Sequence, residues 1–182
     1  MVPGGVWALV AIGLLWGGWQ LISWGVRAYV DSRIENNVGH AVVDFALPDL
    51  DQHLWRAQDL RGKTVILHFF RSKCPVCLAE APVYRALEQR LDPDRAVLLG
   101  VLLDRVQGFG QDATARTLEQ LAYHHPILVA DEAFVDAFHG AGWAHVTPIT
   151  YVVDPGGKIT ATLRGYHEID DIAAVLPAGS LR

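Results

Sequence analysis

The alternation of buried strands with helices between residues 64 and 176 most constrains the fold of this chain. Two runs, Thr64–Phe70 and Ala96–Leu103, are almost continuously apolar, as expected of strands buried on both faces of a sheet. The shorter strand candidates are Pro126–Ala130, Ile149–Val153 and Ile159–Leu163. The helix candidates between and after the strands are Pro75–Leu91, Ala113–His124, Glu132–His139 and Ile169–Leu176.

This order predicts an α/β fold. Strands separated by helices form βαβ units, which produce a mainly parallel sheet with helices on both faces. The last two strands are joined by Pro155-Gly156-Gly157, which predicts a hairpin turn. An antiparallel edge is therefore expected on the sheet.

The N-terminal stretch has a different composition, because no charged residue occurs from Val2 to Val26. Its polar interruptions after residue 5 are Gln20 and Ser23. About 20 apolar residues in a helix cover the ~30 Å hydrocarbon core of a bilayer. A cleaved signal peptide would carry a basic start and a shorter apolar run. A buried helix of a soluble domain is the other alternative, and an uncleaved transmembrane anchor is preferred to both.

The chain is therefore divided into a transmembrane anchor (1–26), a polar linker (27–43) and one domain (44–182). Arg27 and Arg33 follow the anchor, so the positive-inside rule weakly favours a cytoplasmic domain. The cysteine chemistry described below favours the opposite side of the membrane, and we follow the chemistry. The lipid bilayer is thus one expected partner.

Composition excludes two other classes. The formal net charge of −5 argues against a nucleic-acid partner, which would require a basic face. The only two cysteines of the 182 residues stand three positions apart, so they do not staple a small disulfide fold. A zinc site needs about four ligands, and the histidines supply no second pair at a suitable spacing. No metal site is predicted.

The motif that can carry out a reaction is Cys74-Pro75-Val76-Cys77. It lies between the first long strand and the first long helix. At a helix N-terminus the unpaired N–H groups and the helix dipole stabilise a thiolate at Cys74. Pro75 suits the first helical turn, and the positive charge of Lys73 is expected to lower the same thiol pKa. The spacing lets Cys77 attack the Cys74 sulfur and expel a partner held in a mixed disulfide.

The domain resembles the thioredoxin superfamily, and most closely the TlpA/ResA-like group of membrane-anchored, extracytoplasmic thioredoxins. The resemblance covers roughly residues 44 to 176. The motifs that carry it are Asp44-Phe45, Leu47-Pro48, Leu60-Arg61-Gly62-Lys63, Cys74-Pro75-Val76-Cys77, Ala79-Glu80-Ala81-Pro82, Val146-Thr147-Pro148, Asp154-Pro155-Gly156-Gly157-Lys158 and Gly165.

This resemblance implies a thioredoxin-like fold, with a central mixed sheet flanked by helices. It implies that Cys74 attacks and Cys77 resolves, and that their disulfide is the only redox group, without a further cofactor. It also places Thr147 and Pro148 in a cis-proline loop that binds the client peptide. From the residues alone, an ordinary trans proline opening a strand is the alternative.

Two residues depart from the family pattern. Lys73 stands where an aromatic residue usually precedes the first cysteine, and His68 replaces a buried acid or Asn. His68 is either a hydrogen-bonded core residue or a proton relay to Cys77 through water. Together with Pro75 and Val76, these residues are expected to modulate the redox potential, whose value is left open.

The resulting hypothesis is a reductase of client cysteines in the periplasm or extracytoplasmic space, held in the cytoplasmic membrane by a single span. The resemblance implies a membrane electron donor of the DsbD/CcdA kind and clients in cytochrome c or copper-protein maturation. The alternatives are a disulfide oxidase, a copper(I) metallochaperone-like module and a thiol peroxidase. The stretch Phe70-Arg71-Ser72-Lys73 lacks the proline that peroxiredoxins carry ahead of their cysteine.

Overall fold

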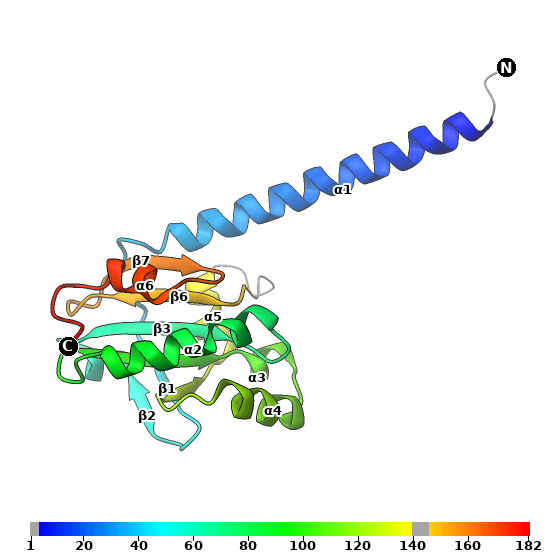
Figure 1. Cartoon of the computed structure of the whole chain (residues 1–182). Coiled ribbons are helices and arrows are strands. Elements are labelled where there is room, and N and C mark those ends of the chain that lie inside the picture. Colours follow the sequence, from blue (N-terminus) through cyan, green and yellow to red (C-terminus); the bar gives the residue numbers. More distant parts are fainter. Residues whose placement is uncertain (1–3, 140–145) are drawn as a thin grey trace.

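The computed structural model describes residues 4–139 and 146–182, with no side chain described before Ile12. A long N-terminal helix is followed by an α/β domain (Figure 1). The strands are β1 (Ala46–Pro48), β2 (Leu54–Arg56), β3 (Thr64–Phe70), β4 (Ala96–Leu102), β5 (Ile127–Val129), β6 (Ile149–Val153) and β7 (Ile159–Arg164). The helices are α1 (Gly4–Glu35), η1 (Ala57–Leu60), α2 (Pro75–Arg90), α3 (Asp104–Gln107), α4 (Gln111–Leu121), α5 (Glu132–His139) and α6 (Ile169–Val175).

The central sheet has five strands in the order β5-β4-β3-β6-β7. Strands β3, β4 and β5 are parallel, whereas β6 and β7 are antiparallel to their neighbours. The β6–β7 hairpin turns at Gly157, whose φ of +85° lies in the region that glycine adopts without strain. The mixed sheet and the terminal hairpin expected from the sequence are confirmed.

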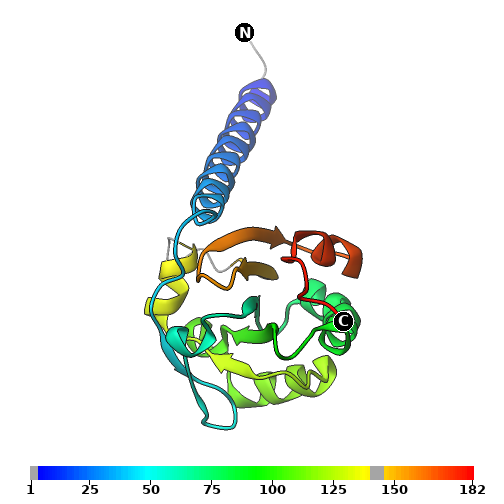
Figure 2. The same cartoon turned by 90° about the vertical axis from the view of Figure 1, so that its left-hand side faces the viewer.

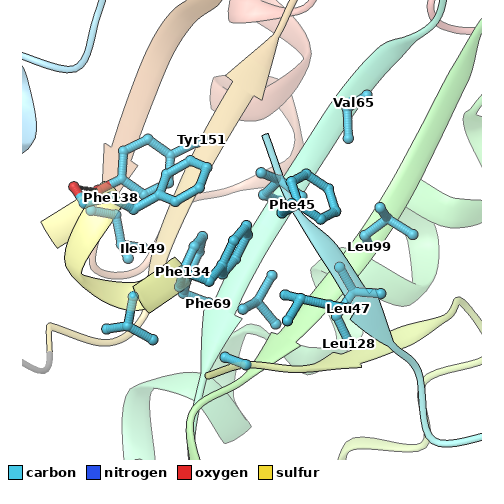
Figure 3. Packing of buried hydrophobic residues seen from close by; sticks show 14 of the residues in the cluster. Phe45, Leu47, Val65, Phe69, Leu99, Leu128, Phe134, Phe138, Ile149 and Tyr151 are labelled. Carbon is cyan, nitrogen blue, oxygen red and sulfur yellow. Dashed lines mark hydrogen bonds between the residues drawn. The ribbon is translucent and has the colours of Figure 1, made fainter. Parts of the chain in front are cut away.

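Strand β3 runs through the centre of the sheet, and all seven of its residues are buried. Because side chains alternate along a strand, Val65, Leu67 and Phe69 face one layer, which includes α5. In Figure 3 the ring of Phe69 packs among the aromatic rings of this layer, and Phe69 and Phe134 stack with centroids 5.8 Å apart. The opposite face of β3 packs against α2. Helix α2 therefore packs on the central strand of the sheet.

Apart from α1, the main helices and strands lie within three residues of their predicted bounds. The pair β1–β2, the short helix α3 and the turn η1 were not predicted. Each is only three or four residues long, so neither strand alternation nor helical periodicity has room to develop.

Helix α1 continues past Val26 to Glu35, into the stretch predicted as a linker. Its C-terminal end packs on the domain, where Ile34 is buried and Asp31 forms an ion pair with Arg164. The rest of α1 projects away from the domain in both views (Figures 1 and 2). Within the described part of the chain, no helix combines the length and the apolar character that a membrane crossing requires.

Candidate active site

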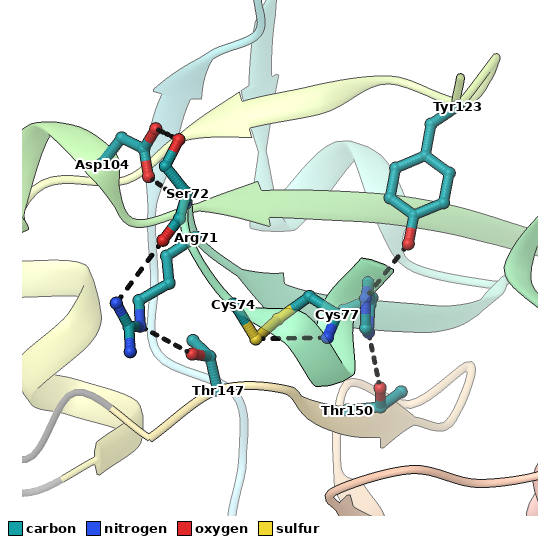
Figure 4. The surroundings of a disulfide bond; sticks show 9 residues. Arg71, Ser72, Cys74, Cys77, Asp104, Tyr123, Thr147 and Thr150 are labelled. Atoms are coloured by element: carbon teal, nitrogen blue, oxygen red, sulfur yellow. Dashed lines mark hydrogen bonds between the residues drawn. A yellow bond between two sulfur atoms is a disulfide. The ribbon is translucent and has the colours of Figure 1, made fainter. Parts of the chain in front are cut away.

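The two cysteines lie at the junction between the central strand β3 and helix α2. Cys74 and Cys77 are joined in a disulfide, with their Cα atoms 5.3 Å apart (Figure 4). Both sulfurs pack in a small apolar cluster that includes Phe70 and Leu121. The carboxyl end of a parallel strand is where open α/β sheets place their reactive groups.

Cys74 caps the N-terminus of α2. Its sulfur accepts a hydrogen bond from the backbone N–H of Cys77 at 3.2 Å. Pro75 occupies the first turn, as predicted, where its missing N–H removes no helical hydrogen bond. The side chain of Cys77 is fully buried, whereas Cys74 keeps 4 % of its surface exposed. Of the two residues, Cys74 is the slightly more accessible one.

The loop before Cys74 is fixed by a buried carboxylate. Asp104 Oδ1 accepts the Ser72 backbone N–H at 2.7 Å, and Oδ2 accepts the Ser72 hydroxyl at 2.5 Å. The hydroxyl of Thr114 also donates to Oδ2, at 2.6 Å. Lys73 follows with φ of +57°, a left-handed conformation that places its side chain in solvent. Because Lys73 is exposed, solvent screens its charge from the disulfide.

Thr147 and Pro148 form the second loop of the site, and the peptide bond between them is cis. Ile149 pairs with Phe69, so this loop lies at the same end of the sheet as the cysteines. Arg71 joins the two loops. Its Nε donates to Thr147 Oγ1 at 3.1 Å, and its Nη1 donates to the Ser72 carbonyl at 3.4 Å (Figure 4).

His68 lies on the α2 face of β3 and is fully buried. Its Nδ1 is 3.0 Å from Thr150 Oγ1, and its ring stacks on Tyr84 with centroids 3.7 Å apart. Burial, assisted by the nearby His125, holds the pKa of His68 well below its usual value, so the ring is neutral at neutral pH. These contacts are those of a hydrogen-bonded core residue. An effect of His68 on the cysteines stays a prediction.

Glu80 is an ionisable residue of the site for which no role was predicted, although it lies within the motif Ala79-Glu80-Ala81-Pro82. It follows Cys77 by three positions, so the two side chains share the buried face of α2. Glu80 Oε1 accepts the backbone N–H of His167 at 3.1 Å, and Oε2 has no hydrogen-bond partner among the described residues. Burial raises the pKa of Glu80 to about 7, although the His167 hydrogen bond acts in the opposite direction.

A carboxyl group with this pKa can take up or release a proton near neutral pH. The signal available in the sequence was an acid at helical spacing from Cys77, on a face otherwise occupied by Ala81 and Tyr84.

Val76, in contrast to Glu80, points into solvent beside the disulfide. Among the described residues, no three acidic, histidine or cysteine side chains gather as metal ligands.

Residues 38–162, well over half of the chain, match the model of the AhpC/TSA family. The chain belongs to the AhpC/TSA family. This match agrees with the thioredoxin-superfamily resemblance and covers the disulfide, the cis-proline loop and most of the sheet.

Relatives of this AhpC/TSA protein give its enzyme class. It is 27 % identical over 135 residues to "Thiol-disulfide oxidoreductase ResA" of Geobacillus thermodenitrificans, covering 74 % of each chain. It is 25 % identical over 164 residues to the ResA of Oceanobacillus iheyensis, covering 86 % of this chain and 82 % of the relative. The prediction of a thiol–disulfide oxidoreductase is confirmed at this level.

Solved structures confirm the fold. The exposed lipoprotein thioredoxin Etrx1 of Streptococcus pneumoniae superposes with a TM-score of 0.62 at 28 % identity, over 72 % of this chain and 96 % of that one. StoA of Bacillus subtilis superposes with a TM-score of 0.61 at 18 % identity, over 73 % and 96 % of the two chains. The thioredoxin-like architecture of the AhpC/TSA domain is thus shared with both proteins.

Proposed function

We propose that this protein is a membrane-anchored, extracytoplasmic thiol–disulfide oxidoreductase that reduces cysteines of client proteins. The observation that carries the proposal is the Cys74–Cys77 disulfide at the N-terminus of α2, with the Cys77 N–H directed at the Cys74 sulfur. In the reduced protein the same N–H and the helix dipole stabilise a thiolate at Cys74.

The reaction proceeds by two exchanges. The Cys74 thiolate attacks one sulfur of a client disulfide, forms a mixed disulfide with it and expels the other client sulfur as a thiolate. Cys77 then attacks the Cys74 sulfur, which forms the Cys74–Cys77 disulfide and releases the second client thiolate. The client gains two electrons and the protein loses two.

The second exchange requires Cys77 to lose its proton in a buried position. Glu80 lies on the same helix face, and its pKa of about 7 suits it to accept this proton. We assign Glu80 this role, because the neutral His68 has a lowered pKa and is a weaker base. Thr147 and Pro148 are proposed to hold the client segment beside Cys74.

The direction of electron flow is proposed from the resemblance to ResA-like proteins. A membrane donor of the DsbD/CcdA kind would re-reduce the disulfide, and the clients would be proteins of cytochrome c or copper-site maturation. Titration of the domain against glutathione tests this direction. A potential near −120 mV, the value of a strong oxidant, would establish an oxidase instead.

The proposed anchor is the stretch 1–26, which has no charged side chain, and the side chains before Ile12 lie outside the described ones. The described side chains Ile12, Leu14, Leu15 and Trp16 are 62 to 75 % exposed, a degree of apolar exposure that water disfavours. The relative named an exposed lipoprotein agrees with an extracytoplasmic domain. Carbonate extraction tests the anchor: the full chain should stay with membranes, and a chain starting at residue 27 should not. Protease protection in sealed vesicles tests the orientation.

Two rivals from other functional classes make different predictions. A copper(I) metallochaperone would bind the metal through the reduced cysteines without reducing insulin. A thiol peroxidase would consume peroxide with a thiol donor. The proposed function predicts insulin reduction and no peroxide turnover above the uncatalysed rate.

A further inference from the structure

We propose that Arg71 is a specificity-determining residue, which selects client segments carrying an acidic side chain next to the reactive cysteine. This inference rests on the proposed function, because it names the class of client that the site prefers.

The position of Arg71 is set by three contacts. Its Nε donates a hydrogen bond to Thr147 Oγ1, and its Nη1 donates one to the Ser72 carbonyl. The guanidinium therefore bridges the cis-proline loop and the loop of Cys74. Its third contact is the ring of Phe109, whose centroid is 5.8 Å from the Arg71 Cζ atom. A half-buried cation is therefore held between the two loops that are proposed to contact the client.

The charge of Arg71 is not neutralised within the described chain. No carboxylate of the described residues lies within 4.0 Å of its nitrogens. The stretch 140–145, which is not described, contains no acidic residue in its sequence. Asp104 braces the same loop, but its two oxygens already accept hydrogen bonds from Ser72 and Thr114.

The remaining donors of Arg71 suit a carboxylate. A guanidinium has five N–H donors in a planar fork, and the contacts to Thr147 and Ser72 use two of them. Carboxylates match this fork and are bound with two parallel hydrogen bonds. A partly desolvated arginine without an internal partner therefore favours an acidic group on the incoming chain, and disfavours a basic one.

Peptide substrates test this inference. Each peptide carries one cysteine in a mixed disulfide with 2-nitro-5-thiobenzoate, and Glu, Gln or Lys on both sides of that cysteine. Attack on the peptide sulfur releases the coloured thiolate, and Cys77 then releases the peptide. The readout is the ratio, between the Glu and Gln peptides, of the second-order rate constant for thiolate release in a single turnover of the reduced protein. Taking this ratio within each variant cancels any difference in the folded fraction or in the positioning of Thr147.

The reduced wild-type protein should react with the Glu peptide roughly 5- to 20-fold faster than with the Gln peptide at low peptide concentration. Arg71→Gln should bring this ratio close to 1, and Arg71→Lys should give an intermediate ratio because it keeps the charge without the fork. The matched control is Lys73→Gln, which removes a neighbouring exposed charge and should keep most of the preference.

Equal rates for Glu, Gln and Lys peptides in the wild type would overturn the role of Arg71 while leaving the exchange activity in place. A preference for the Glu peptide that survives Arg71→Gln would likewise overturn it, and its loss in Lys73→Gln would assign the preference to Lys73. Release of no thiolate from any peptide would overturn the proposed function and this inference together.

Discussion

The Ser72 hydroxyl donates to Asp104 Oδ2 at 2.5 Å, and the Ser72 backbone N–H donates to Oδ1 of the same carboxylate at 2.7 Å. Both residues are almost completely buried. Asp104 begins α3 at the end of β4, so this pair ties the loop of Cys74 to the neighbouring strand of the sheet. The attacking sulfur is positioned by a strand and a carboxylate.

Asp104→Asn should destabilise the protein by about 2–4 kcal/mol, because an amide group cannot accept all three hydrogen bonds and hydrogen bonds to charged groups are worth about 1.5–3 kcal/mol each. Denaturant unfolding of the oxidised form measures this loss. Asp112→Asn, an exposed acid on α4, is the matched control and should change stability by less than about 0.5 kcal/mol. Equal losses of stability in the two variants would contradict the claim that Asp104 holds the loop of Cys74 in place.

Glu80→Gln should change how stability depends on pH. The pKa of Glu80 is about 7 in the folded protein, above its usual 4.5, so the folded state holds an extra proton between these values. Its contribution to stability is therefore present at low pH and is lost as pH rises toward 7, by up to about 3 kcal/mol. The stability of Glu80→Gln relative to wild type should rise across this window and then level off.

The control for this effect is Glu119→Gln, an exposed acid on α4, which should leave the curve parallel to wild type. A Glu80→Gln curve that also stays parallel to wild type would mean that Glu80 titrates normally. In stopped-flow kinetics, Glu80→Gln should slow the release of client from the mixed disulfide more than its formation, because only the release depends on Cys77.

The acid side of the stability curve should be governed by buried histidines. Burial lowers the pKa of His125 to about 4, with the charge of His124 acting in the same direction, although Glu88 lies 3.5 Å from the ring. Between pH 4 and about 6.5, His125 therefore binds a proton in the unfolded chain but not in the folded one. The free energy of unfolding falls as pH drops through this range. His125→Phe, which retains a ring against Tyr123, should reduce this loss by about 1–3 kcal/mol.

Urea unfolding between pH 4 and 7.5 provides the measurement. His53→Gln, at an exposed histidine, is the matched control. An unchanged slope in His125→Phe would assign the acid sensitivity to other groups, of which the fully buried His68 is the first to test.

Lys73 has a left-handed backbone, so its tolerance to substitution should follow conformation rather than charge. Lys73→Gly should keep or slightly raise stability, whereas Lys73→Val should cost about 1–2 kcal/mol because a β-branched residue resists this conformation. Thermal unfolding of the two variants separates them. Equal stabilities would mean that the loop adopts another backbone conformation.

The sequence predicted the fold well where the pattern was long. Strand β3 is almost continuously apolar and its bounds were predicted correctly, because a strand buried on both faces leaves a strong signal. The continuation of α1 to Glu35 was missed: polar residues suggested a linker, but Ile34 packs into the domain core and stabilises the last turns. That contact is tertiary and has no local signature.

The site was predicted in part. The spacing of Cys74 and Cys77 located the disulfide, since a short motif at a strand–helix junction is readable from local sequence. The bridge from Arg71 to Thr147 joins residues 76 positions apart, so no local pattern reports it. The raised pKa of Glu80 depends on burial beneath the segment around His167, which only the folded arrangement defines.

The attacking role of Cys74 is tested by the mass of the covalent adduct that single-cysteine variants form with a disulfide-containing peptide. Cys77→Ser should accumulate close to one equivalent of peptide on Cys74, because the attacking cysteine is present and the resolving one is not. Cys74→Ser should form little adduct, since Cys77 is fully buried in the folded protein. An adduct that forms equally fast on Cys77 in Cys74→Ser, or none in Cys77→Ser, would contradict the assignment of Cys74 as the attacking residue.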